Sequence, residues 1–183
     1  MKDIFMNKGP KNKNARASAS QFFVAAELCR RGYVAVVTMG NTPNTDILCS
    51  NIEGTKFVHI QVKTYIPGNK SVIVTRKAEI NYGKNFIWVL AGIPKAQSND
   101  PFEYFVIPSS KISKYIRQSH QLWLKKPGKK GQSHKDTDMR AVILPPGKDL
   151  SGWSVAQYKN NWSIIEKLLD RPSKRKVRSK SYA

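Results

Sequence analysis

Acidic residues are scarce in this 183-residue sequence, which has 12 Asp and Glu against 32 Lys and Arg and a formal net charge of +20 at pH 7. Such a surplus does not define a fold, but dense basic surfaces attract the phosphates of DNA or RNA. Long apolar runs and amphipathic helices with a clean basic face are absent, which argues against a membrane surface as the partner. We therefore expect a nucleic acid as the partner and no membrane.

Cysteine is also scarce, since Cys29 and Cys49 are the only two and both lie in apolar segments. This pattern favours two buried thiols in a reducing cytoplasm over a disulfide or a metal site. Residues 1–18 lack the apolar core of a secretion signal. We expect a cytoplasmic protein.

The chain is long enough for one domain with a sizeable core, because 40% of its residues are hydrophobic. Residues 1–16 are rich in Lys, Asn and Gly, which predicts a flexible basic N-terminus. Residues 171–183 read as a basic disordered tail. A single domain is expected over 17–170.

Hydrophobic periodicity predicts helices and strands in mixed order. Helices are expected over 18–33, capped by Ser18 or Ser20, over 109–124, capped by Ser109 or Ser110, and over 154–170. Residues 125–140 should form a loop. The expected strands are 34–39, 45–51, 56–65, 71–77, 85–93, 102–108 and 141–146. The apolar face of the last helix is expected to comprise Val155, Tyr158, Trp162, Ile165 and Leu169. The order indicates an α/β fold with one central mixed β-sheet flanked by helices.

Polar residues are concentrated at one end of the strand over 56–65. Alternation places Val58, Ile60 and Val62 on a core face and the polar pair Gln61 and Lys63 on the other face, with His59 beside them as a satisfied core histidine. Asp46 begins the preceding strand, and a hairpin closed near 52–55 would place it roughly opposite Lys63. Polar groups at the end of a buried strand need partners there.

Glu27 is the single charge in the helical stretch FFVAAELC. An ionised carboxylate on an apolar helix face is costly unless a group of opposite charge pairs with it. A metal ion or Lys63 would serve, and Arg30 or Arg31 on the same helix is the alternative.

These features together resemble the PD-(D/E)xK nuclease superfamily, in a variant with Gln-x-Lys. The resemblance rests on a helical AE followed by GY, an aspartate near a proline in TPNTD and a strand ending in QVK, over about residues 20–65. The superfamily includes restriction endonucleases, archaeal Holliday-junction resolvases and some homing endonucleases. The resemblance implies a restriction endonuclease-like core and a DNA-cleaving enzyme, with a homodimer as in many members.

The resemblance also implies roles for individual residues. Asp46 matches the metal-binding aspartate, Gln61 the position usually held by Glu or Asp, Lys63 the catalytic lysine, and Glu27 the helical glutamate that many members add. Mg²⁺, or Mn²⁺ in its place, would lie between Asp46, Gln61 and Glu27. Such an ion lowers the pKa of a bound water and polarises a phosphate oxygen, while Lys63 positions the water or offsets developing charge. Two departures are the neutral Gln61 and Pro43, which precedes Asp46 by three positions rather than one.

Other interpretations remain open. Singly, Lys63 suits a solvent-facing strand end, Asp46 a turn, and Gln61 an edge-strand hydrogen bond. The neutral Gln61 favours a catalytically inactive nucleic-acid-binding protein of the same fold. A basic RNA-binding protein without any site would place Glu27, Asp46 and Lys63 far apart.

A basic loop offers a phosphate-binding surface separate from this motif. The nucleic-acid contacts expected there are Lys125, Lys126, Lys129 and Lys130, extended by Arg76 and Lys77. His120, His134, Asp136 and Asp138 lie in the same region, but their spacing fits no metal-ligand pattern, which favours a solvated loop.

Overall fold

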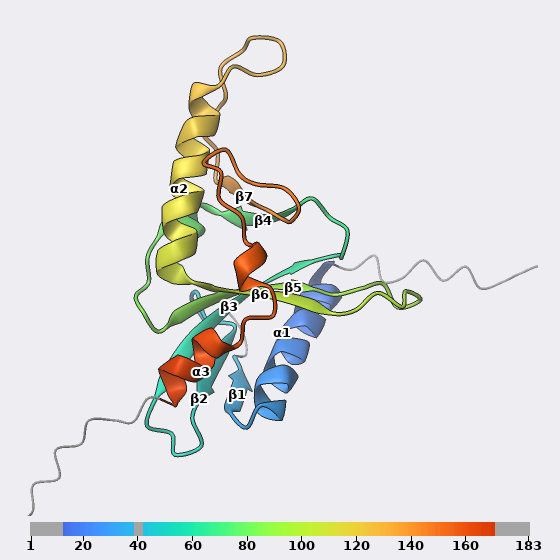
Figure 1. Ribbon diagram of the computed structural model, residues 1–183, viewed down its shortest axis with the longest axis vertical. Helices are drawn as coiled ribbons and strands as arrows, with labels where there is room; N and C mark the ends of the chain where they lie inside the picture. The colour runs from blue at the N-terminus through green and yellow to red at the C-terminus, as the bar shows by residue number, and fades with distance from the viewer. Residues whose placement is uncertain (1–12, 39–41, 171–183) are drawn as a thin grey trace, which may run out of the picture.

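A computed structural model describes residues 13–38 and 42–170, and all statements below concern these residues. The elements in chain order, shown in Figure 1, are α1 (Lys13–Arg30), β1 (Val34–Val37), β2 (Ile47–Ser50), β3 (Phe57–Tyr65), β4 (Ser71–Thr75), η1 (Arg76–Glu79), β5 (Phe86–Gly92), β6 (Glu103–Pro108), α2 (Ser109–Lys125), β7 (Met139–Ile143), η2 (Ala156–Tyr158) and α3 (Ser163–Leu169). None of the described helices is long and apolar enough to span a bilayer.

The main sheet has five strands in the order β1-β2-β3-β5-β6. Neighbouring strands are antiparallel except β3 and β5, which run parallel with Gln61 beside Trp88 and Lys63 beside Leu90. A parallel pair requires a crossover connection, and residues 66–85 provide it. The expected mixed sheet with flanking helices is therefore confirmed.

The strands over 71–77 and 141–146 do not join this sheet, contrary to the expectation of a single sheet. They form β4 and β7, which pair antiparallel in a separate two-stranded sheet. The reason is topological, because β4 lies within the crossover and the facing edges of β3 and β5 are already hydrogen-bonded to each other. Val72 and Val74 of β4 are buried against the main sheet.

Each face of the main sheet carries its own apolar core. On one face, α1 and α3 contribute Val24, Leu28 and Ile165 to a cluster with Ile60. On the other face, α2 and the β4–β7 sheet cover Trp88 and neighbouring side chains. Figure 1 shows α1 and α3 beside the strands and α2 extending away from them. The two faces matter for the site, since Gln61 and Lys63 alternate with Ile60 and so point away from α1.

The helix starts differ from the expected caps. The helix already includes residues 13–16, so Ser18 and Ser20 lie inside α1, and the Ser20 hydroxyl donates to the Ala17 carbonyl. Neither Ser109 nor Ser110 caps α2, whose N-cap position is Pro108. The Ser109 hydroxyl instead accepts the Tyr82 N–H and lies within 3.3 Å of the Ile80 carbonyl. The Ser20 and Ser109 hydroxyls therefore bond other backbone groups and do not cap a helix.

The expected closing helix over 154–170 is broken into η2 and α3. Asn160 has a φ of 50°, and its backbone N–H and side-chain carbonyl bond the carbonyl and N–H of Tyr104. This strand-like pairing with β6 is incompatible with a continuous helix. The five residues expected on its apolar face are nevertheless all buried, divided between the two cores.

The two cysteines have different environments. Cys49 is buried, as expected, and burial raises the pKa of its thiol to about 12. Cys29 is exposed on α1, so the expectation of two buried thiols is wrong for this residue. Both thiols are free.

Candidate functional site

The β2–β3 hairpin places Asp46 opposite Gln61. Ile47 pairs with Ile60, and the Asp46 N–H continues the ladder by donating to the Ile60 carbonyl at 2.9 Å. The expected partner was Lys63, so the register differs by two residues. The cause is the turn, which Asn51 closes by accepting the N–H groups of Thr55 and Lys56 with its side-chain oxygen.

Asp46 is hydrogen-bonded to the strand that faces it. Its Oδ2 accepts the Val62 N–H at 2.7 Å and the side-chain amide of Gln61. Burial raises the pKa of Asp46, and the Val62 N–H, the positive charge of Lys63 and the Gln61 amide oppose that rise. The protein therefore offsets only part of the cost of burying the ionised carboxylate. A bound cation would stabilise the ionised form further.

Lys63 follows on the same face of β3, beyond Gln61. Its side chain is half-buried and makes no ion pair within residues 13–38 and 42–170, although its charge acts on Asp46. Trp88 and Leu90, its neighbours on β5, are buried and form a rigid apolar base. The ammonium group is thus available to an external anion.

Glu27 does not join this group. Its two carboxylate oxygens bind Arg30 and Arg31 at 2.8–2.9 Å, and Arg31 continues to Glu166 of α3. The hydrogen bond from Arg30, opposed by burial, lowers the pKa of Glu27. The alternative pairing with arginines on the same helix is the one that the structure has.

The position of α1 explains why Glu27 lies apart. Ser20 bonds the hydroxyl of Thr64 at 2.6 Å, which fixes where α1 passes the end of β3. Glu27 lies about 10 Å further along the helix axis, at a rise of about 1.5 Å per residue. Sequence reasoning missed this contact, because a serine–threonine pair has no distinctive spacing.

His59 lies on the open side of the hairpin. Its Nδ1 is 3.2 Å from the hydroxyl of Thr45, the residue before Asp46. The side chain is exposed, so the expected satisfied histidine is hydrogen-bonded but is not part of the core.

Tyr65 anchors the end of β3 two residues after Lys63. The ring is buried, and its hydroxyl donates to Glu103 at 2.8 Å, which in turn binds Lys159 at 2.6 Å. Burial raises the pKa of this phenol. Gly92 lies opposite on β5, where a Cβ atom would be 2.7 Å from the Tyr65 ring. The glycine therefore permits the packing that holds the strand end.

The donors at the hairpin suit a hard cation, but only a few are present. Among the described residues, no three His, Cys, Asp or Glu side chains are arranged to hold a metal ion. Asp46 accepts both hydrogen bonds through Oδ2, which leaves Oδ1 for a cation, and the Gln61 amide offers a second oxygen. Mg²⁺ retains several waters and commonly uses one or two carboxylates together with substrate phosphates. The residues fit a site that the substrate completes.

The expected basic residues cluster at the far end of α2. This helix has 17 residues, about 25 Å, and carries the loop after Lys125 away from the main sheet (Figure 1). Lys126, Lys129 and Lys130 are exposed in that loop. Arg76 lies beside it through an ion pair with Asp136 at 3.2 Å. We call Lys125, Lys126, Lys129 and Lys130 the lysine cluster. Arg76 and Lys77, both exposed, therefore extend this cluster rather than the Asp46 site.

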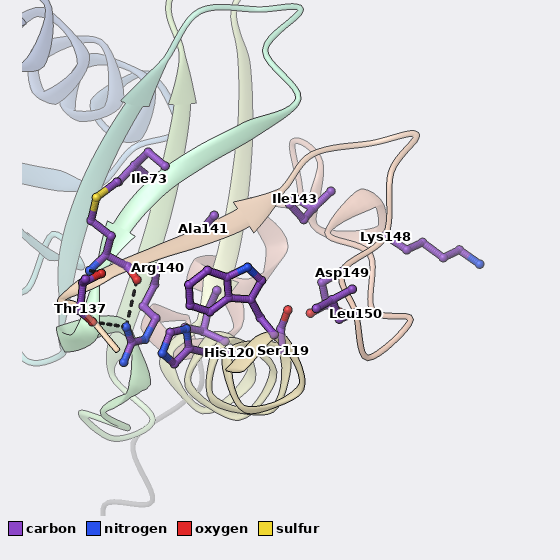
Figure 2. A pocket seen from close by; sticks show the side chains of 13 residues that line it. Ile73, Ser119, His120, Thr137, Arg140, Ala141, Ile143, Lys148, Asp149 and Leu150 are labelled. Carbon is purple, nitrogen blue, oxygen red and sulfur yellow. Dashed lines mark hydrogen bonds between the residues drawn. The ribbon is translucent and has the colours of Figure 1, made fainter. Parts of the chain in front are cut away.

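This loop is largely exposed, as expected of a solvated segment, and side chains hold it at its base. His120 binds Asp136 at 2.9 Å, and the buried Arg140 binds the same carboxylate. The Trp123 ring stacks on His120 and His134 with centroid distances of 5.4 and 3.9 Å. Figure 2 shows His120 and Arg140 beside a cavity of about 500 Å³ between α2, β7 and residues 148–150.

The fold is that of the restriction endonuclease-like proteins. A solved structure of a bacterial homing endonuclease, I-Ssp6803I, superposes with a TM-score of 0.50 at 11% identity, covering 86% of this chain and 94% of that chain. Hjc, a Holliday junction resolvase from Archaeoglobus fulgidus, gives a TM-score of 0.40 at 14% identity, covering 74% and 92%. No family model and no curated protein matches the sequence. At 11% identity, the likeness to I-Ssp6803I shows the fold alone.

Proposed function

We propose that this chain is a metal-dependent endonuclease that hydrolyses phosphodiester bonds of DNA. One observation carries the proposal: on the hairpin of a restriction endonuclease-like fold, Asp46 is hydrogen-bonded to Gln61 and is within the electrostatic reach of Lys63. In this proposal Asp46 and Gln61 hold Mg²⁺, or Mn²⁺ in its place. Glu27 is left out because arginines occupy both of its oxygens.

The chemistry follows from what each side chain offers. A Mg²⁺ ion, when bound, supplies an activated water and polarises a phosphate oxygen. Asp46 contributes the negative charge that attracts the cation, and the Val62 N–H fixes the direction of its carboxylate. Lys63 donates hydrogen bonds to the scissile phosphate and offsets the charge that develops there. No residue needs to attack the phosphorus atom.

The lysine cluster supports a DNA path along α2. The length of α2, about 25 Å, corresponds to about 7 base pairs at ~3.4 Å each. Lys111, Lys114 and Lys125 are exposed along the helix between the sheet and the loop. A duplex lying along α2 would be held by these residues while one phosphate reaches Lys63.

Removing two loop lysines should weaken DNA binding mainly at low salt. For the variant Lys129→Ala/Lys130→Ala, the slope of log affinity against log salt should fall by about 1.8, because each phosphate contact contributes about 0.9. Fluorescence anisotropy with a labelled duplex measures this slope. The matched control, Lys95→Ala/Lys167→Ala, removes the same charge from exposed positions elsewhere. Equal slopes for the two variants would contradict the assignment of the loop.

Metal removal is the direct test of the enzyme proposal. Supercoiled plasmid should be nicked by the protein with Mg²⁺ or Mn²⁺, left intact in excess EDTA, and nicked again when the ion is restored. Gel electrophoresis of the topoisomers provides the measurement. DNA binding should persist in EDTA, since the lysine cluster does not require a metal ion.

The second candidate is a DNA-binding protein of the same fold without catalysis. The neutral Gln61 and the absence of a three-ligand acidic cluster in the described residues favour it. This candidate predicts tight duplex binding and no nicking with any divalent cation.

A further inference from the structure

The two-stranded sheet of β4 and β7 is apolar on both faces, but its outer face is largely uncovered. Val72 and Val74 of β4 point inward and are buried against the main sheet. Ile73 lies between them in sequence and points outward, where its side chain is 54% exposed. Met139 of β7 shares this outer face and is 61% exposed. Exposed apolar side chains that gather on one surface are typical of a binding site.

A cavity of about 500 Å³ opens beside this outer face, between β7, the second half of α2 and residues 148–150 (Figure 2). Its volume lies in the range of small-ligand pockets, ~300–1,000 Å³. Most of its walls are apolar, and they include Ile73, Ile116, Met139, Ala141 and Ile143. Leu150 and the ring of Trp123 complete these walls. The cavity therefore offers a preformed place for a flat apolar group.

The edge of β7 that faces away from β4 supplies polar groups to this cavity. The Arg76 N–H donates to the Asp138 carbonyl at 2.9 Å, which fixes the phase of the β4–β7 ladder. Because bonded and non-bonded pairs alternate along an antiparallel ladder, Met139, Ala141 and Ile143 direct their N–H and C=O groups away from β4. These three residues line the cavity.

Two of the three leave their backbone groups open. The Met139 carbonyl accepts the Arg140 guanidinium at 2.9 Å, and the Met139 N–H donates to the Thr137 hydroxyl at 3.4 Å. In the part of the chain that the structure describes, no loop or side chain bonds the N–H and C=O groups of Ala141 and Ile143. An open edge of two residues is too short for an added peptide strand, and it suits a single flat group with donors and acceptors on its rim.

Basic residues surround the cavity. Lys148 lines it and is exposed, and the lysine cluster begins two residues after Trp123 in the sequence. Arg140, His120 and Asp149 also line the cavity, but each is bonded within the protein. The charges left for a ligand are therefore positive, which favours an anionic molecule.

We propose that this cavity receives one unpaired base of a bound DNA strand, while phosphates next to that base contact Lys148 and the lysine cluster. The inference rests on the DNA binding proposed above and does not require cleavage. The apolar walls accept the faces of the ring, and the open backbone groups of Ala141 and Ile143 pair with the donors and acceptors on its edge. A base inside a duplex is stacked and paired, so the protein should prefer DNA that carries an unpaired nucleotide.

Other occupants match these features less well. An acyl chain or an apolar side chain of a peptide would fill the walls, but it would leave the backbone groups of Ala141 and Ile143 without partners. A free mononucleotide has the base but only one phosphate for the lysine cluster, so it should bind far more weakly than a strand.

Fluorescence anisotropy in EDTA, where no metal-dependent cleavage occurs, tests the inference on the full chain. Three labelled duplexes share one sequence: the first is fully paired, the second has a single unpaired adenine, and the third has an abasic site in place of that adenine. Wild type should bind the adenine duplex about ten-fold more tightly than the abasic duplex, a typical contribution of one base held against apolar and aromatic side chains. Because both duplexes carry the same extra backbone unit, the difference reports on the base.

Blocking the cavity should remove this difference. Ala141→Phe places a ring in the cavity from a strand position, where Phe is favoured, and Ala96→Phe makes the same change at an exposed site in the β5–β6 turn. Ile73→Glu adds a negative charge at the wall, and Ile52→Glu adds it to a side chain that is 74% exposed in the β2–β3 turn. Both cavity variants should bind the adenine and abasic duplexes equally, and both controls should behave as wild type. Thermal unfolding by circular dichroism shows that each variant is folded.

Equal affinity of wild type for the adenine and abasic duplexes would overturn the inference, as would a difference that persists in both cavity variants. Displacement of the adenine duplex by deoxyadenosine monophosphate at a similar concentration would also overturn it, because the cavity would then bind free nucleotides. Tight binding of the paired duplex without any preference for the adenine refutes this inference alone. Failure to bind any of the three duplexes refutes the proposed DNA binding as well.

Discussion

We expect Asp46→Asn to lower the proposed metal-dependent cleavage rate by about 1,000-fold or more and to leave the fold intact. The asparagine side chain can still accept the Val62 N–H that Asp46 accepts, but it removes the negative charge that attracts a divalent cation. A metal ion contributes several kcal/mol to charge stabilisation, at about 1.4 kcal/mol per ten-fold in rate. Plasmid nicking under single-turnover conditions gives the rate.

Glu27→Gln is the matched control for this substitution, because it exchanges another partly buried carboxylate for an amide. Since Glu27 binds Arg30 and Arg31, we expect wild-type cleavage and a stability loss of at most about 1 kcal/mol. Wild-type cleavage by Asp46→Asn would contradict the assignment of Asp46 as a metal ligand. Loss of cleavage by Glu27→Gln would contradict the exclusion of Glu27 from the metal site.

The same Asp46 variant should change stability with pH in a definite direction. Burial raises the pKa of Asp46 above that of an unfolded aspartate. The ionised form is therefore less favourable in the folded chain, and the stability that the protonated form provides is lost as the pH rises through the folded pKa. In EDTA at pH 8, Asp46→Asn should melt at a higher temperature than wild type, with the difference shrinking towards acid pH. Added Mn²⁺ should raise the melting temperature of wild type alone.

Lys63→Gln should lower the proposed cleavage rate by about 100- to 1,000-fold, the usual loss when one donor to a developing negative charge is removed. Affinity for DNA should change little, because Lys63 is one of 32 basic residues. The separation of rate from affinity distinguishes a catalytic lysine from a phosphate anchor. Single-turnover nicking and anisotropy measure the two quantities on the same preparation.

Lys56→Gln is the control for Lys63, since it removes a half-buried lysine just before β3. The Lys56 ammonium donates to the Leu169 carbonyl, so its role is to hold α3 against the hairpin. Its loss should cost some stability and leave the rate per folded molecule unchanged. Equal rate losses in both variants would show that Lys63 acts through the structure of β3.

Local patterns in the sequence predicted the parts of the site that depend on local rules. Alternation along β3 separated Val58, Ile60 and Val62 from Gln61 and Lys63, and the structure has these two faces. The register was wrong by two residues, since it depends on how Asn51 closes the turn. Glu27 was predicted to join the metal site because its neighbours on the helix are apolar. In the structure it instead pairs with Arg30 and Arg31, which lie three and four residues further along the same helix.

Long-range pairing could not be predicted in this way. β4 and β7 are separated by more than sixty positions, and nothing in either segment identifies the other as its partner. Asn160 ends the expected last helix by pairing with Tyr104, a contact that depends on where β6 lies. In each case the deciding partner is distant in sequence, so a short window does not contain it.

The packing of Tyr65 against Gly92 restricts how sequences with this architecture can diverge. A side chain at position 92 would displace the Tyr65 ring, and with it the strand end that carries Lys63. In any descendant that acquires a larger residue there, the aromatic ring opposite must be exchanged in the same lineage. A larger residue at position 92 should therefore appear only together with, or after, a smaller side chain at position 65.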